Sequence, residues 1–494
     1  MPKVTFSSVG ARVRSIRGAM ALGLVILANP AAAQKDGEIQ AMKQEIRTLQ
    51  QQLNAMQRRV AARPEPARKG GSVAKGAEGA VVAAPPSLGG VTFPNGRPTL
   101  TSADGNFSLG IYGRVQSDVG TYFDEVGRDF NDGWNFRRAR LGAVGSIWKD
   151  FTYSLIYDFG GSPDGAGSLY EASLGYTGVK RFNFRIGAYK PFFSLEDSIS
   201  SADLLFHERA SIVEIARSVA AGTARMSAGG SVADEGYFVS AYLTGPTVGV
   251  EANDEQVGGV ARVAFQPFRG PNYLVHVGAS GAAAFAPTQN AGGVIGISRR
   301  QIQLRDRPEI RIDSTRLIDT GLLSYRDAYT VGFELAGHVN NFSLQGEYYA
   351  ININQDRAPG LSSPNLTFDG YYVQGSWIIT GESRRYNTNS AAYAAPRVAN
   401  PVHAGGWGAW ELVGRYSYAN LNDKDVPGRS VTTTGSVRGG EQTTYTVGLN
   451  WYPNQNVRFM LNYVNGNVDR VNAAGTAQIG QSFQALALRS QFSF

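Results

Sequence analysis

Cysteine is absent from the 494 residues, and histidine occurs only four times. Without cysteine the chain forms neither disulfides nor thiolate metal sites, a composition that suits both cytosolic and exported proteins. The sequence contains no His-Glu-x-x-His pair, no Gly-Lys phosphate loop and no Gly-x-Ser-x-Gly turn. The four histidines are also far apart in the chain: His207, His276, His338 and His403. These absences argue against catalysis, and we expect neither an enzyme nor a bound cofactor or metal.

Long apolar runs are also missing, and a membrane-spanning helix needs about 20 such residues. The short run AMALGLVILA, residues 19–28, follows a basic N-terminal stretch and precedes NPAAAQ. This pattern predicts a secretory signal peptide over residues 1–33, cleaved after Ala33. An exported chain without apolar helices can cross a bilayer only as a closed barrel. The net charge of +7 is spread too thinly to indicate nucleic-acid binding.

Residues 34–61 carry apolar residues at alternating spacings of three and four: Ile39, Met42, Ile46, Leu49, Leu53, Met56 and Val60. This seam predicts a coiled coil, and isoleucine at two a positions favours a trimer over a dimer. The alternative is one amphipathic helix packed on its own domain. Residues 62–104 argue against that alternative, because they are expected to form a Pro, Gly and Ala-rich linker that leaves the seam only sister helices to pack on.

From residue 105 to the C-terminus, apolar and polar side chains alternate in short runs separated by glycine and turn sequences. FSLGIYGRVQSD (residues 107–118), FTYSLIYDF (151–159) and VRFMLNYVNG (457–466) place large apolar side chains on one face and polar side chains on the other. Two all-β solutions fit this pattern: a large soluble sandwich or solenoid, and an antiparallel transmembrane β-barrel.

Aromatic residues favour the barrel. Phe151 with Phe159, and Tyr445 with Trp451, stand at the ends of apolar faces, where a barrel has its two interfacial girdles. The final strand, LALRSQFSF, ends in Phe494 and resembles the assembly signal of bacterial outer-membrane proteins. We therefore expect residues 105–494 to form an all-β transmembrane barrel of about 16 strands in the outer membrane of a Gram-negative bacterium.

Arginine recurs in RRQIQLRDRPEIRIDSTR, residues 299–316. If this segment is extended, its polar face carries Arg299, Arg305, Arg307 and Arg311, and its other face is mostly apolar. In a barrel that face lines the lumen, as do the polar faces that carry Arg114, Arg138, Arg140, Arg185, Arg415 and Arg489. Rows of guanidinium groups could pass oxyanions along a pore. The alternative is that the arginines pair with inward acids such as Asp118 and Asp158 and serve only the structure of the barrel.

Residues 191–222 break the strand alternation and are too long for a hairpin turn. They are expected either to fold into the lumen as a constriction loop or to rest outside on the rim. Their acids outnumber their arginines: Glu196, Asp197, Asp203, Glu208 and Glu214 stand against Arg209 and Arg217. Inside the lumen, this excess of acids would weaken any preference for anions at the narrowest point.

Several motifs, in the same order along the chain, resemble those of the phosphate-selective porin family: YGRVQSD, FRRARLG, YDFG, FSLEDSISSADLLFHERA, GSWIITGESRRY, GAWELVGRYSY and the terminal strand. The resemblance covers nearly the whole predicted barrel. It implies a homotrimeric outer-membrane barrel that conducts small anions such as phosphate, and some family members carry a similar N-terminal coiled coil.

By this resemblance, the central anion site comprises Arg114, Arg137, Arg138 and Asp158, and Arg299, Arg305, Arg307 and Arg311 form an arginine ladder. Strict alternation points Arg137 away from Arg138, so both line the pore only if a bulge or a strand start intervenes. Where the family has Leu-Glu-Lys in the constriction loop, this chain has Leu195, Glu196 and Asp197. An acid in place of a lysine puts the expected phosphate specificity in doubt.

The sequence thus supports two hypotheses of function. The first is a passive, water-filled channel for small solutes, especially anions such as phosphate. The second is a weakly selective general porin whose coiled coil also tethers the outer membrane to the cell wall. In both, the partners are sister chains and membrane lipids.

Overall fold

The computed structural model describes Gln44, Gln51 and residues 88–494, with gaps at 124, 126, 162–164, 166, 250–251, 288 and 291–299. The predicted signal peptide, the coiled coil apart from those two glutamines, linker residues 62–87 and Arg299 lie outside the described residues. The described strands belong to the second of two compact units, Ala84–Phe494. No helix in the described part of the chain is long and apolar enough to cross a membrane.

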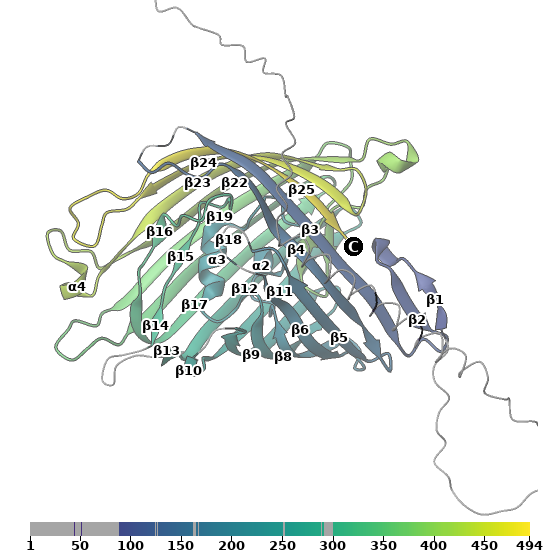
Figure 1. Ribbon diagram of the computed structural model, residues 1–494, viewed down its shortest axis with the longest axis horizontal. Helices are drawn as coiled ribbons and strands as arrows, with labels where there is room; N and C mark the ends of the chain where they lie inside the picture. The colour runs from purple at the N-terminus through teal and green to yellow at the C-terminus, as the bar shows by residue number, and fades with distance from the viewer. Residues whose placement is uncertain are drawn as a thin grey trace, which may run out of the picture. The chain divides into compact units, whose positions relative to one another are not determined.

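Sixteen of the described strands pair antiparallel in a closed ring (Figure 1). They are β3 (Ser108–Phe123), β4 (Gly133–Ile147), β5 (Phe151–Asp158), β6 (Ser168–Tyr176), β7 (Phe182–Tyr189), β8 (Arg225–Ala233), β9 (Tyr237–Thr247), β11 (Val257–Gly270), β12 (Tyr273–Ala286), β17 (Leu323–Val339), β18 (Phe342–Gln355), β19 (Asn365–Ile378), β22 (Ala409–Asp423), β23 (Val437–Tyr452), β24 (Val457–Asp469) and β25 (Ser482–Ser493). The terminal strand β25 closes the ring on β3, with Arg489 opposite Asp118. The predicted all-β barrel of about 16 strands is confirmed.

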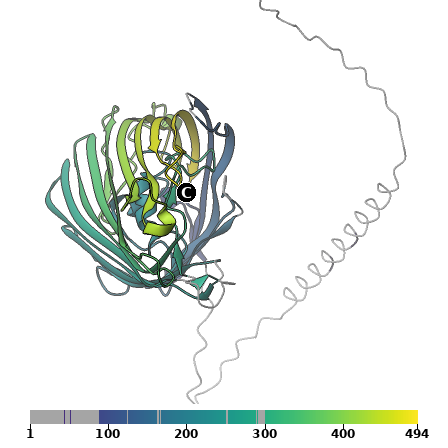
Figure 2. The same ribbon diagram turned by 90° about the vertical axis from the view of Figure 1, so that its left-hand side faces the viewer.

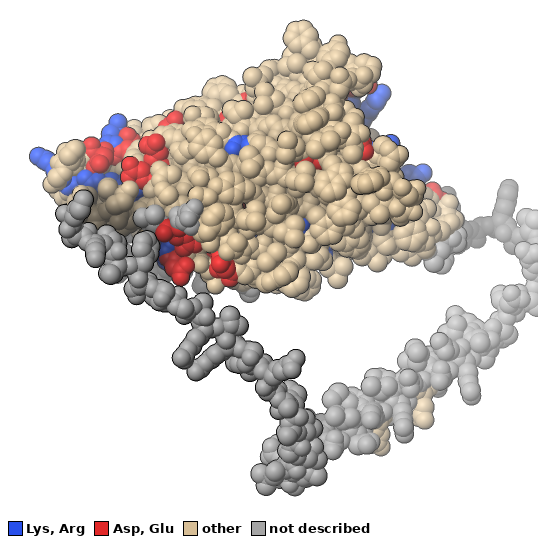
Figure 3. All heavy atoms as spheres, turned by 90° about the horizontal axis from the view of Figure 1, so that it is seen from above, with Lys and Arg blue, Asp and Glu red and all other residues tan. Residues whose placement is uncertain are grey.

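Along most of the barrel strands, apolar side chains point out of the ring and polar side chains point in. In β3, Leu109 and Ile111 are exposed, whereas Arg114 and Gln116 are buried in the interior. Figure 3 shows the result from outside, where charged side chains gather toward two ends and few lie between them. On the outer face of β17, β18 and β19, apolar side chains such as Leu335 and Leu344 line a groove of about 1160 Å³. A water-soluble sandwich would not expose such a surface.

Aromatic residues form two rows, one across β18, β19, β22 and β23 and the other across β19, β22 and β23. In the row nearer the C-terminus of the chain, the Trp410 ring stacks on the Trp451 ring, and Trp377 stacks on Phe342. Six positions away on the same strands, the Tyr416 ring contacts those of Tyr371 and Tyr445. Six residues of a strand span about 20 Å. The two rows therefore stand at different heights on the outer surface, as the two interfacial girdles of a membrane barrel do.

Two segments differ from the sequence predictions. Residues 88–102, placed in the linker by their composition, form β1 (Leu88–Thr92), the 3₁₀ turn η1 (Pro94–Gly96) and β2 (Thr99–Ser102), and β2 pairs with β3. The linker prediction is wrong for these residues, because Thr99, Leu100 and Thr101 find backbone partners on the free edge of β3 below the ring.

Residues 300–322 are not the extended strand that the alternation of arginine and apolar residues predicted. They form only the short pairs β14 (Gln301–Ile302), β15 (Arg305–Asp306) and β16 (Ile318–Asp319), within the connection between β12 and β17. Pro308 cannot donate to a ladder, and Glu309 adopts a φ of 56° that breaks an extended backbone. Ile310 and Ile312 pack in a buried cluster against barrel residues such as Tyr122 rather than facing lipid.

The remaining described elements are short and lie in connections between barrel strands. They are α2 (Leu195–Ser198), α3 (Ser211–Ser218), β10 (Ala252–Asp254), β13 (Gln289–Asn290), β20 (Arg385–Asn387), β21 (Ala392–Ala394), η2 (Val402–Ala404) and α4 (Val431–Thr434). Two of these connections contribute to the interior. The loop between β7 and β8 and the loop between β19 and β22 leave opposite ends of the barrel, because the strands alternate in direction.

Candidate pore constriction

The loop between β7 and β8, residues 190–224, lies inside the ring of strands. Its helices α2 and α3 appear within the ring in both side views (Figures 1 and 2). Phe193, Leu195, Ile212 and Val213 have no exposed surface. Of the two arrangements that the sequence allowed, the structure has the constriction loop rather than the external one.

An apolar patch on the inner wall explains why the loop turns inward. Ile351, Ile353 and Phe368, on β18 and β19, point into the lumen and form one buried cluster with α3. Ile212 of α3 lies directly over Gly370, where a Cβ atom would come within 2.8 Å of its side chain. Burial of a complete isoleucine side chain contributes roughly 1.5–3 kcal/mol. The hydrophobic contact thus fixes one side of the loop to the wall.

Side chains of the barrel wall, and Arg384 of the loop between β19 and β22, hold the backbone of the same loop. Arg458 donates to the Leu204 carbonyl at 2.6 Å and to the Ala202 carbonyl at 3.2 Å. Further donations to successive loop carbonyls come from Arg384 to Asp203 (2.6 Å), Arg415 to Glu208 (3.0 Å), Asn450 to Leu205 (3.0 Å) and Arg489 to His207. The predicted lumenal side chains of Arg415 and Arg489 therefore anchor the loop.

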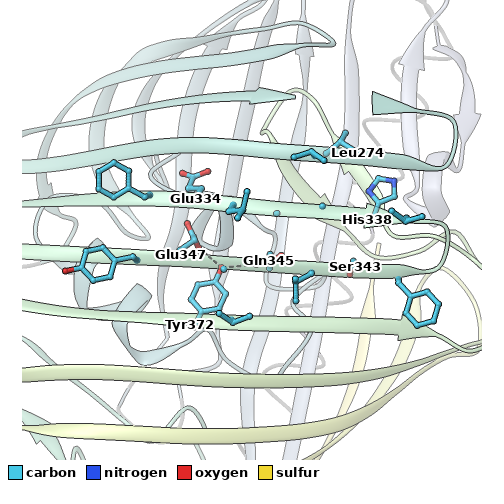
Figure 4. A pocket seen from close by; sticks show the side chains of 18 of the residues that line it. Leu274, Glu334, His338, Ser343, Gln345, Glu347 and Tyr372 are labelled. Carbon is cyan, nitrogen blue, oxygen red and sulfur yellow. Dashed lines mark hydrogen bonds between the residues drawn. The ribbon is translucent and has the colours of Figure 1, made fainter. Parts of the chain in front are cut away.

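On β18, a carboxylate holds the first turn of α2. The two Glu347 oxygens accept the backbone N–H groups of Leu195 and Glu196, each at 2.9 Å. The Tyr372 hydroxyl donates to Glu347 at 2.6 Å and accepts from Gln345 at 2.9 Å, as the dashed lines of Figure 4 show. Because a helix start presents unpaired N–H groups, an inward acid at this point can position the loop.

Between the loop and the wall of β4 and β6 lies a cavity of about 260 Å³, which we call the arginine cavity. Its lining includes seven cationic side chains: Arg137, Arg138, Arg140, Lys190, Arg209, Arg217 and Arg311. Only two carboxylates, those of Asp158 and Glu214, are among the described residues that line it. Cations therefore outnumber carboxylates in this lining, and Glu208 and Asp197 lie against several of the same cations from outside it.

A β-bulge brings Arg137 and Arg138 to the same side. Gln116 of β3 pairs with Arg138, but the next residue, Ser117, pairs with Phe136, so Arg137 is the extra residue. Both arginines therefore line the arginine cavity, as the resemblance requires. The sequence signal for the bulge was the pair of adjacent arginines itself, which strict alternation cannot place on one face.

The other wall residues of the site are held by specific partners. Arg140 Nε donates to Asp158 Oδ2 at 2.7 Å, and its guanidinium lies over the Tyr170 ring, 3.5 Å from the centroid. Arg114 does not line the cavity; it donates to the Ser201 hydroxyl at 2.7 Å and to Ser200 at 3.1 Å. Sequence reasoning missed Ser201 and Tyr170, since neither stands in a charge pattern.

Asp197 does not place a negative charge in the arginine cavity. Its side chain is fully buried, and its carboxylate lies 3.1 Å from Arg217 Nε, 3.9 Å from Lys190 Nζ and 4.0 Å from Arg209 Nε. The cations on which Asp197 acts are themselves cavity residues, and Lys190 supplies an ammonium group beside it. Any effect of Asp197 on anion preference therefore acts through these three cations, whose charge it offsets. Burial lowers the pKa of Lys190 to about 7, although Asp197 opposes this shift.

Of the proposed arginine ladder, only Arg311 reaches the arginine cavity among the described residues. Its guanidinium lies 3.4 Å from Glu214 and 3.6 Å from Glu208. Arg305 is 43% exposed and 4.0 Å from Asp319. Arg307 is buried outside the cavity lining, and Arg299 lies outside the described residues. The predicted strand is thus absent from residues 300–316, and the folded loop brings one arginine of the predicted ladder, Arg311, to the cavity.

Comparison of the sequence with known proteins shows its family. Residues 109–494 match the family described as Phosphate-selective porin O and P. Porin O of Pseudomonas aeruginosa is 27% identical over 402 residues, covering 78% of this chain and 88% of that protein, and an uncharacterized Caulobacter vibrioides protein is 28% identical over 484 residues, 89% of each. An anion-selective porin from Comamonas acidovorans has a TM-score of 0.47 at 12% identity, covering 78% of this chain and 100% of that one. The chain belongs to the phosphate-selective porin O and P family and forms a solute channel in the outer membrane of a Gram-negative bacterium.

Proposed function

We propose that the channel selects small anions, with oxyanions such as phosphate as its preferred class, and that the arginine cavity is its filter. The supporting observation is the lining of seven cations against two carboxylates around about 260 Å³. A guanidinium stays protonated and offers parallel donors that match two oxygens of a phosphate or carboxylate. Conduction also needs several such groups in sequence, so that an ion can leave one as it binds the next.

The first test is electrical. In planar bilayers under a potassium chloride gradient, the refolded chain is expected to show a reversal potential of anion-selective sign, and added phosphate is expected to block chloride current. Arg138→Ala removes one cavity cation and is expected to weaken both effects. Arg185→Ala is the matched control, since Arg185 pairs with Glu171 and is not a cavity residue.

A reversal potential near zero with no phosphate effect would contradict this proposal and favour the weakly selective porin. That alternative has a second part, the tether to the cell wall, which rests on the heptad seam of residues 34–61. The same seam supports our proposal that the chain assembles as a homotrimer. A chain lacking residues 34–83 separates the roles: conductance that persists while cell-wall association disappears would show that a tether coexists with the channel.

The selectivity is also expected to depend on pH. Because the pKa of Lys190 lies at about 7, its ammonium charge is present below that pH and is lost as the pH rises through it. Anion selectivity should therefore be higher at pH 6 than at pH 8, by about threefold if the charge acts at roughly 7 Å in water. Burial also raises the pKa of Asp306 to about 7. Asp306 therefore gains its negative charge as the pH rises through that value, which also lowers anion selectivity.

Reversal potentials at pH 6, 7 and 8 measure this dependence. Lys190→Met keeps the length of the side chain without its charge and is expected to remove most of the difference between pH 6 and pH 8. A pH dependence that is unchanged in Lys190→Met would assign the effect to other groups such as Asp306.

A further inference from the structure

Four arginines from three parts of the chain converge on the Glu208 carboxylate. Arg137 holds it with two parallel bonds, Nε to Oε1 at 2.7 Å and Nη2 to Oε2 at 3.0 Å. Arg489 donates to Oε1 at 2.9 Å and Arg138 to Oε2 at 3.1 Å. Arg311 Nε lies 3.6 Å from Oε2. Glu208 itself belongs to the constriction loop, whereas three of these arginines stand on the barrel wall.

The arginines around Glu208 are arranged as an oxyanion-binding site, and the ligand in that site is the Glu208 side chain. Two-point contact by one guanidinium and single contacts from others is the way proteins bind phosphate and carboxylate ligands. Asp118 neutralises Arg489 through two bonds of 2.6 Å. Glu208 is the carboxylate partner of both Arg137 and Arg138. If the Glu208 carboxylate were absent, Arg137 and Arg138 would therefore be available to bind another anion.

Glu208 stays ionised and lies beside the arginine cavity. Burial opposes its ionisation, but Arg137, Arg138 and Arg311 outweigh that effect and hold the pKa of Glu208 well below its usual range. The same three arginines line the cavity, so they contact Glu208 from one side and face the solute space from the other. An anion in the cavity and the Glu208 carboxylate would thus share the same hydrogen-bond donors.

We propose that Glu208 is an internal counter-anion, which occupies an oxyanion site built by Arg137, Arg138, Arg311 and Arg489 and competes with each phosphate or carboxylate that enters the cavity. This inference rests on the proposed anion selectivity and specifies how it is tuned. Without a competitor, a cluster of arginines would retain an oxyanion and stop the flow. With Glu208 present, the site releases it, as conduction requires.

Glu208→Gln removes the competing charge at nearly constant size. In bilayer recordings, the phosphate concentration that half-blocks chloride current is expected to fall about tenfold, the value of roughly one charge-assisted hydrogen bond. Glu411→Gln is the matched control, because Glu411 is a buried lumenal acid whose partner, Arg384, does not line the cavity. It makes the same charge change and is expected to leave the half-blocking concentration within about twofold.

If the Glu208→Gln variant does not refold, the Glu208→Asp variant provides a second test of the proposal. The shorter aspartate side chain keeps the charge but cannot reach Arg137 and Arg489 together. The phosphate concentration that half-blocks the current is therefore expected to fall about threefold. Equal or weaker block in these variants, while the unsubstituted channel is anion-selective and blocked by phosphate, would overturn the counter-anion and leave the proposed function intact. Block that appears only in Glu208→Gln would support the counter-anion and refute phosphate binding by the natural channel. Absence of block in every chain would overturn both.

Discussion

Arg458→Ala combined with Asn450→Ala is expected to detach part of the constriction loop and raise the single-channel conductance. The two side chains donate to the carbonyls of Leu204 and Leu205, and Arg458 shares the Ala202 carbonyl with Gln491. Each buried carbonyl left without a donor costs about 1–3 kcal/mol. The apolar contact of α3 with the wall remains, so the loop is expected to move at residues 200–206 while the barrel stays folded.

Two measurements follow this change. Single-channel recordings are expected to show larger and noisier currents, and trypsin is expected to cut the loop at Arg209, which is buried in the unsubstituted chain. Arg458→Lys retains a charge and some donors and should give an intermediate conductance. Arg269→Ala is the control for loss of a wall arginine, since Arg269 forms a partly exposed pair with Glu235. Unchanged current and trypsin resistance would mean that the apolar contact alone holds the loop.

The barrel wall could be predicted from the sequence because its rule is local. In β3 and β25 every second side chain faces lipid, so Arg114 and Arg489 were assigned inward from their strand neighbours alone. The same rule failed for residues 300–316, where an alternating pattern packs against the inside of the barrel instead of forming part of it. An alternating pattern shows only that the two faces of a segment lie in different surroundings. The sequence alone does not show that both faces of this segment lie inside the barrel.

The candidate site could be predicted only in part. Arg137, Arg138, Arg140 and Asp158 are consecutive or on paired strands, so strand pairing and resemblance brought them together. Lys190 and Arg217 join them through the fold of the loop, which no strand rule describes. Strand alternation points both Arg415 and Arg140 inward. It could not show that Arg415 holds the Glu208 carbonyl whereas Arg140 faces the cavity. That distinction depends on where the loop lies, and hence on the apolar patch of β18 and β19.

Loss of the Arg262–Glu334 pair is expected to have the largest effect on stability. Both side chains are fully buried, and Arg262 Nε and Nη2 donate to the carboxylate at 2.8 Å. Arg262 also donates to the carbonyls of Ser390 (2.7 Å) and Ala391 (2.8 Å), in the loop that enters from the opposite end. Arg262→Met leaves a buried acid without its cation, a change that costs about 3–5 kcal/mol in unfolding free energy.

The double variant Arg262→Met with Glu334→Met decides what the pair contributes. Replacement of a buried ion pair by apolar groups is often neutral, so the double variant is expected to recover most of the loss. Recovery should be incomplete, because the Ser390 and Ala391 carbonyls still lack the guanidinium, at about 1–3 kcal/mol for each buried carbonyl. Urea unfolding of the barrel in lipid vesicles, followed by tryptophan fluorescence, measures all three chains. A single variant as stable as the natural chain would show that water reaches the pair; a double variant no better than the single one would show that the hydrogen bonds to residues 390–391, and not the ion pair, hold the two ends of the lumen together.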